Sequence, residues 1–312
     1  MAATHHHGPA PGRSLAVSAG LTLAFVAGEA VAGYLANSLA LLADAGHNFA
    51  DALALLFSWY GVRAARRPAD ARRTFGSHRV GVLAALANAA SLVVLALLVF
   101  WEAAQRLRAP EPVASGPMIG VALVAVVLNG LITFWLHGEA KHDLNVRSAY
   151  LHMLGDALSA LGVVAAGAVV ALTGWAAADP AVSLLIGGLI LWSSWGILNE
   201  SVNVLLEAVP AGLDLAELER AVKEIPGVLG VHDLHVWTIA SGMVACSCHL
   251  VVAEQSVREG QQVLRAAAGL LRERFHVSHT TIQVEVEGCD PDHLYCTLRR
   301  ADPHDHGPAC PP

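Results

Sequence analysis

The stretch LALLADAGHNFAD, residues 39–51, places a histidine and an aspartate four positions apart inside an apolar run. The stretch YLHMLGD, residues 150–156, repeats this spacing about a hundred residues later. In an α-helix, positions i and i+4 lie on one face, about 6 Å apart along the axis. Two such faces turned toward each other offer two imidazoles and two carboxylates, a tetrahedral ligand set that suits Zn²⁺. The four candidate ligands are His47, Asp51, His152 and Asp156.

Both stretches belong to a series of long apolar runs. Each run has about 19–27 residues, which is enough to cross ~30 Å of hydrocarbon as an α-helix. The sequence therefore predicts an all-α bundle of six membrane helices. The six runs are Ser14–Ala36, Leu39–Val62, Val80–Ala104, Met118–Leu136, Val146–Leu172 and Ala181–Leu206.

The membrane setting makes the four candidate ligands costly unless they have a partner. A charged aspartate at the centre of a membrane helix costs at least ~2.5–3.5 kcal/mol on insertion scales. The apolar runs around the four residues contain no Lys or Arg at comparable depth. A shared cation is therefore the favoured partner. The alternative is that each histidine caps a backbone group and each aspartate pairs with a basic residue.

Charge is distributed unevenly along the chain. Only 14% of the residues are charged, against about 25% in soluble domains. Up to Glu207 there are 11 basic and 12 acidic residues, and from Ala208 onward there are 8 and 14. A membrane part thus precedes an acidic soluble part, which disfavours nucleic-acid binding and suits cation binding. We predict a His-containing tail (1–13), a transmembrane domain (14–207), a cytoplasmic metal-binding domain (208–288) and a Cys/His-containing tail (289–312).

The basic residues between the runs predict the orientation in the membrane. Residues 63–79 contain six arginines, whereas the links 37–38 and 174–180 contain no basic residue. Arg106 and Arg108 in another link are a minor exception. Both termini are therefore expected in the cytoplasm. The 17 arginines against 2 lysines are typical of a bacterial gene of high GC content, so we expect a bacterial inner membrane.

The soluble part follows the order helix, strand, strand, helix, strand. Asp214 and Ser256 are predicted N-caps of two amphipathic helices. Residues 228–240 and 243–252 are predicted strands joined by a Ser-Gly turn, and residues 280–287 alternate as a third strand. This order predicts a small α+β domain in which two helices cover one face of the sheet. With about 75 residues its core is modest, so a metal or a partner subunit would add stability.

Strand alternation predicts which side chains lie on the uncovered face of this sheet. His249 and Glu285 have the parity opposite to the apolar positions of their strands, so we expect them to share that face. His232 and His235 differ in parity, and strict alternation allows only one of them to join. His279 lies near the start of the third strand. These residues predict a carboxylate–imidazole metal face, and a solvated polar face is the alternative.

Further histidines and cysteines lie elsewhere in the soluble part and in the tails. Cys246 and Cys248 are on the apolar face of their strand, where a core position is favoured over a ligand role. His293 and Cys296 are three residues apart, which is a zinc half-site that needs ligands from elsewhere. The tract His5–His7 is either a metal site or an unstructured end.

Four ordered motifs resemble the cation diffusion facilitators, most closely their zinc-exporting branch. They are NSLALLADAGHNFAD (37–51), TFGSHRVGVLAAL (74–86), the His152/Asp156 pair and VHDLHVWTI (231–239). The resemblance covers roughly residues 14–287. It implies six membrane helices, a cytoplasmic αββαβ domain of the ferredoxin-like, metallochaperone-like type, and a homodimer.

The resemblance also implies roles for individual residues. The two His/Asp pairs correspond to the transport site, and His47 favours zinc, with cobalt and cadmium as lesser substrates. Zinc-binding positions in the cytoplasmic domains of relatives correspond to His232, His249 and Glu285. Weaker correspondences to metal ligands are His279, His293, Cys296 and His78. Arg79 and Glu207 resemble a charge pair that holds the membrane and cytoplasmic halves of a dimer together.

These observations predict a proton-coupled Zn²⁺ exporter rather than an enzyme, with Zn²⁺ also acting as a regulatory ligand. Zinc needs neutral imidazole and ionised carboxylate, so metal and protons compete for one set of groups. A membrane metal sensor or scaffold that binds Zn²⁺ without transport is the alternative. Asp44 either guides the ion or hydrates a helix end. For Glu29, a hydrogen-bonded structural role is favoured over proton carriage.

Overall fold

The computed structural model describes residues 11–138, 140, 144–287 and 294. The contacts divide the chain into two compact units. One unit contains residues 1–60 and 83–199, and the other contains residues 61–82 and 200–312.

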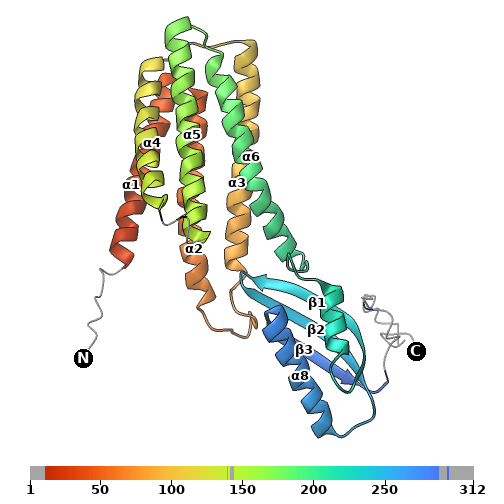
Figure 1. Ribbon diagram of the computed structural model, residues 1–312. Helices are drawn as coiled ribbons and strands as arrows, with labels where there is room; N and C mark the ends of the chain where they lie inside the picture. Colours follow the sequence, from red (N-terminus) through yellow and green to blue (C-terminus); the bar gives the residue numbers. More distant parts are fainter. Residues whose placement is uncertain (1–10, 139, 141–143, 288–293, 295–312) are drawn as a thin grey trace, which may run out of the picture. The chain divides into compact units, whose positions relative to one another are not determined.

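Six long helices correspond one to one to the predicted apolar runs (Figure 1). Within the described residues, α2 to α6 are each long and apolar enough to cross a membrane, and α1 contributes a shorter apolar segment, residues 22–36. The predicted six-helix bundle is therefore confirmed. The helices are α1 (Pro11–Ala36), α2 (Leu39–Ala65), α3 (Val80–Arg108), α4 (Ser115–Leu136), α5 (Leu144–Thr173) and α6 (Ala178–Leu205).

Small side chains allow the membrane helices to approach one another closely. Ala40, Ala43, Ala96 and Ala122 are all buried in the core of the bundle. Next to the first candidate ligand, a Cβ at Gly46 would lie 2.8 Å from Leu95 Cδ2 of α3, so the Leu95 side chain would have to shift to admit a larger residue. Without a hydrophobic driving force in lipid, such close packing is what holds membrane helices together.

The soluble unit has the predicted αββαβ order: α7 (Leu215–Lys223), β1 (Val228–Ala240), β2 (Met243–Val252), α8 (Val257–Phe275) and β3 (Val277–Glu285). The sheet order is β1-β2-β3, with β1 antiparallel and β3 parallel to β2. Both predicted N-caps are present, and Ser256 forms a capping box with Glu259. β3 begins three residues earlier than predicted, because His276 adopts a left-handed conformation (φ 55°) that ends α8 directly before the strand.

A bulge in β1 changes the predicted faces of the sheet. His232 pairs with His249, but His235 pairs with Ser247, so β1 has one extra residue in this interval. Asp233, inside the bulge, has a φ of 49°. Directly paired side chains point to the same face, so His232 and His235 both lie on the face that α7 and α8 leave open. The expectation that only one of them could do so is wrong, because the bulge reverses the alternation.

Candidate functional site

The helices α2 and α5 bring the four membrane candidate ligands together. His47 and Asp51 lie one turn apart on α2, and His152 and Asp156 lie one turn apart on α5. His47 Nε2 is 3.5 Å from Asp51 Oδ2 and 3.5 Å from Asp156 Oδ1. His152 Nε2 is 3.4 Å from Asp51 Oδ2 and 3.7 Å from Asp156 Oδ2. Each imidazole therefore faces both carboxylates, one from its own helix and one from the other.

These four distances are close to the spacing of neighbouring ligand atoms around zinc, but they do not outline a single tetrahedron, because Asp156 offers Oδ1 to His47 and Oδ2 to His152. Zinc bonds to imidazole nitrogen and carboxylate oxygen are about 2.0–2.2 Å long, so neighbouring ligand atoms of a tetrahedral site should be about 3.3–3.6 Å apart. The observed distances of 3.4–3.7 Å are only slightly longer. Asp51 Oδ2 is buried and has no hydrogen-bond donor, although two imidazole nitrogens lie within 3.5 Å. Among the described residues, these four side chains do not bring three ligand atoms within 4.8 Å of one another, so they would have to move closer together to share one cation.

A second polar layer lies one helix turn from this group. Asp44 is 2% exposed, and its Oδ1 accepts a hydrogen bond from Ser159 Oγ of α5 (2.9 Å). The expectation that Asp44 could simply hydrate a helix end is therefore wrong, because the side chain is buried between α2 and α5. Glu29 of α1 is 1% exposed and accepts a hydrogen bond from Asn48 Nδ2 (3.1 Å). The favoured structural role of Glu29 agrees with this bond, although its Oε1 has no donor.

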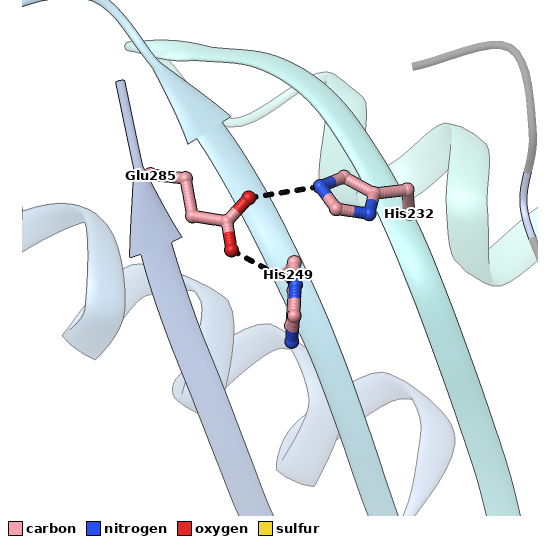
Figure 2. Close-up of side chains that lie close together, drawn as sticks. All are labelled: His232, His249 and Glu285. Atoms are coloured by element: carbon pink, nitrogen blue, oxygen red, sulfur yellow. Dashed lines mark hydrogen bonds and ion pairs between the residues drawn. The ribbon is translucent and has the colours of Figure 1, made fainter. Parts of the chain in front are cut away.

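The open face of the sheet contains a second cluster, drawn in Figure 2. Glu285 Oε2 lies 3.0 Å from His232 Nε2, and Glu285 Oε1 lies 3.0 Å from His249 Nδ1. The two imidazole rings meet edge to face with centroids 5.0 Å apart. One ligand atom from each of the three residues lies within 4.8 Å of the other two. The three side chains come from β1, β2 and β3, so the group joins the whole sheet.

Asp233 was missed as a possible contributor to this cluster. Its Oδ2 lies 3.6 Å from His249 Nε2, and its Oδ1 lies 3.1 Å from His235 Nε2. Asp233 therefore faces the side of the His249 ring that points away from Glu285. Such a carboxylate can orient a metal-binding imidazole. The sequence did place Asp233 directly beside His232 and two residues before His235. Strict alternation along the strand could not show that all three residues contribute to one face.

Two other candidate ligands within the described residues, His279 and His78, are not in these clusters. His279 is paired with Ala245, four residues along β2 from His249, and its ring contacts Phe75 (5.6 Å between centroids). At 3.3 Å per residue this is roughly 13 Å from the cluster. His78 is partly buried in the 61–82 segment. His293 and Cys296 lie outside the described residues, as does the tract His5–His7.

Two further pairs lie in the soluble unit. Cys246 and Cys248 are buried in the core beneath α7 and α8. The hydrogen bond to Cys248 and burial raise the pKa of Cys246, so this thiol stays protonated. Arg79 Nη2 forms an ion pair with Glu207 Oε1 at 3.0 Å. Since both side chains are exposed, the pair contributes about 0–1 kcal/mol.

The chain matches two families of known proteins. The cation efflux transmembrane domain matches residues 15–206, and the cytoplasmic domain of cation efflux proteins matches residues 210–287.

The relatives cover nearly the whole chain. The zinc transporter ZitB of Shigella flexneri is 42% identical over 280 residues, which are 89% of this chain and 88% of that protein. The metal cation efflux system protein CzcD of Cupriavidus metallidurans is 38% identical over 93% of this chain and 92% of its own length. A cadmium, cobalt and zinc/H(+)-K(+) antiporter of Bacillus velezensis is 34% identical over 97% and 98%. A solved metal-bound C-terminal domain of the CzcD transporter is 36% identical over 24% of this chain and the whole of that domain, with a TM-score of 0.22.

Proposed function

The chain belongs to the cation efflux family, in its zinc-exporting branch, and we propose that it exchanges Zn²⁺ for protons through His47, Asp51, His152 and Asp156. It is a multi-pass membrane transporter and not an enzyme. The observation that supports the site best is the set of four nitrogen–oxygen distances of 3.4–3.7 Å between α2 and α5.

The chemistry of the four groups supports coupling to protons. Two carboxylates and two neutral imidazoles carry two negative charges, which balance one Zn²⁺. When the imidazoles bind protons they lose the lone pairs that would bind the metal. Protons arriving from the more acidic side therefore release the ion, and α2 and α5 must move to open the site to each side in turn. Asp44 and Ser159 form a polar contact one turn toward the N-terminus of α2, which in the proposed orientation is the outer side of the site, where protons enter and the released ion leaves.

Orientation and location follow from the charge pattern. The arginines of residues 63–79 favour the cytoplasmic side for that link, which places both termini in the cytoplasm. We propose the inner membrane of a bacterium. The relatives named for cadmium and cobalt support these ions as lesser substrates.

His232, His249 and Glu285 are the proposed regulatory zinc site of a homodimer. Zinc bound there would neutralise part of the negative charge of the soluble domain and so reduce repulsion between two copies. That effect would favour the closed arrangement of the dimer when cytoplasmic zinc is high.

The test is stopped-flow Zn²⁺ uptake into proteoliposomes with an imposed pH gradient. Full-length protein, Asp51→Ala and Asp156→Ala are compared, with Glu200→Ala as a control that removes an exposed carboxylate of α6. We expect rapid uptake for the full-length protein and for Glu200→Ala, and loss of uptake for the two site variants. Uptake by either site variant at the unmodified rate would contradict the proposed site. Zinc binding without any uptake by the unmodified protein would instead support a sensor or scaffold.

A further inference from the structure

Asp179 lies in the first turn of α6, but its carboxylate caps the first turn of a different helix, α2. Ser38 Oγ donates to Asp179 Oδ1 (2.5 Å). The backbone N–H groups of Leu39 and Ala40 donate to Oδ2 (2.7 Å) and Oδ1 (3.3 Å). Asp179 is completely buried. The first N–H groups of a helix have no acceptor of their own, so three donors and the positive end of the α2 dipole stabilise this buried charge.

Capping alone does not require Asp179. Ser38 already acts as an ordinary N-cap, since the backbone N–H of Leu41 donates to Ser38 Oγ (3.2 Å). A serine in this position commonly suffices to begin a helix. The Asp179 carboxylate, unlike a local cap, also fixes the distance between α2 and α6.

The α1–α2 turn, Asn37–Ser38, is also held from other elements. Asn37 has a φ of 53°, and its Nδ2 donates to Glu111 Oε2 (2.9 Å) and to the carbonyl of Pro112 (3.2 Å). The carbonyl of Asn37 accepts a hydrogen bond from Arg106 Nη1 of α3 (2.8 Å). The turn is therefore hydrogen-bonded to α3 and to the α3–α4 link as well as to α6. Asp179 thus binds the N-terminus of α2 next to a turn that other elements also hold in place.

Asp179 also follows shortly after α5 in the sequence, and α5 is the other helix that carries candidate ligands. α5 ends at Thr173 and α6 begins at Ala178, so only residues 174–177 separate them. On α2, His47 lies eight residues beyond Leu39, which is about 12 Å along the helix. Asp179 thus connects the beginning of α2 to the end of α5.

We propose that Asp179 is a positioning residue for the transported metal. By fixing α2 along its axis relative to the end of α5, it keeps His47 and Asp51 level with His152 and Asp156. Metal bonds tolerate errors of about 0.2 Å, so a slip of α2 by about 1 Å would disturb the nitrogen–oxygen distances of 3.4 and 3.5 Å between α2 and α5. Asp179 acts through this alignment and not as a ligand, because both of its oxygens are already engaged by donors. The inference rests on the proposed transport site.

The experiment measures the Zn²⁺ concentration dependence of uptake by full-length protein in proteoliposomes. Only monodisperse, folded protein is reconstituted, and KM and Vmax are determined separately. The variants are Asp179→Ala, Asp179→Asn and Ser38→Ala. The matched control is Ser194→Ala, which removes a buried hydroxyl of α6 that donates to the Ile190 carbonyl of its own helix.

We expect Asp179→Ala to raise KM at least tenfold, because misaligned ligands bind the ion less tightly. Asp179→Asn keeps one acceptor oxygen and should recover part of this loss, and Ser38→Ala should raise KM by a smaller factor. Ser194→Ala should stay within twofold of the unmodified protein. A purely structural role would lower the yield of folded protein and leave KM unchanged, and that result would overturn the proposal.

Asp51→Ala in the same assay distinguishes a failure of the positioning role from a failure of the proposed transport site. If Asp51→Ala abolishes uptake while Asp179→Ala keeps the unmodified KM, only the positioning role fails. If Asp51→Ala transports zinc normally, the proposed site itself fails, and the positioning role fails with it.

Discussion

Zinc bound by His232, His249 and Glu285 should hold the three strands of the sheet together. Each strand contributes one of the three side chains, so the sheet cannot open locally without releasing the ion. Linkage then adds RT ln(1 + [Zn²⁺]/Kd) to the free energy of opening, which is about 2.7 kcal/mol at a zinc concentration of 100 Kd. Amide exchange in β1 and β2 should slow by about the same factor, roughly 100-fold.

Hydrogen–deuterium exchange of the full-length protein in detergent, with and without zinc, measures this factor for peptides from β1 and β2. Glu285→Ala should abolish the zinc effect, and Glu254→Ala, which removes an exposed carboxylate after β2, should keep it. Glu285→Ala will also weaken the metal-free sheet by ~1–3 kcal/mol, because the Nε2 of the buried His232 loses its hydrogen bond to the Glu285 carboxylate. For this reason the comparison is the zinc-dependent change within each protein. Equal exchange with and without zinc, or a full zinc effect in Glu285→Ala, would refute the reasoning.

Three further predictions concern selectivity, packing and pH. His47→Asp replaces a nitrogen ligand by oxygen and should raise uptake of Cd²⁺ relative to Zn²⁺; equal Cd²⁺ uptake by both proteins would remove His47 as the selectivity element. Gly46→Ala should lower zinc uptake, because its Cβ would lie 2.8 Å from Leu95 Cδ2, and Leu95→Ala in the same chain should restore it; failure of this rescue would exclude crowding as the cause. Hydrogen bonds from Ser256 hold the pKa of Glu259 below the ordinary value of a glutamate. The capping box should therefore stabilise α8 fully at pH values above that ordinary pKa, and this stabilisation should be lost as the pH falls through the lowered pKa. Ser256→Ala should flatten this pH dependence in the amide exchange of α8, and an unchanged profile would contradict the assignment.

Local patterns were enough to predict the elements of this protein. The six apolar runs became α1 to α6, and the caps at Asp214 and Ser256 became the starts of α7 and α8. The spacing of four within each His/Asp pair predicted a shared helix face, since that relation depends only on the helical period. That α2 and α5 turn these faces toward each other was a hypothesis based on the cost of unpaired charge in lipid, and the observed distances agree with it.

The tertiary structure alone revealed features that depend on pairing between distant segments. The bulge at Asp233 is a matter of register between β1 and β2, so strict alternation within β1 could not predict where His235 points. Asp44 meets Ser159, and Asp179 caps a helix that begins 140 residues earlier. Hydrophobicity and periodicity act between near neighbours in the chain and are visible in any window of the sequence. A hydrogen bond between separate helices exists only once packing has placed them side by side, and therefore only the folded chain shows it.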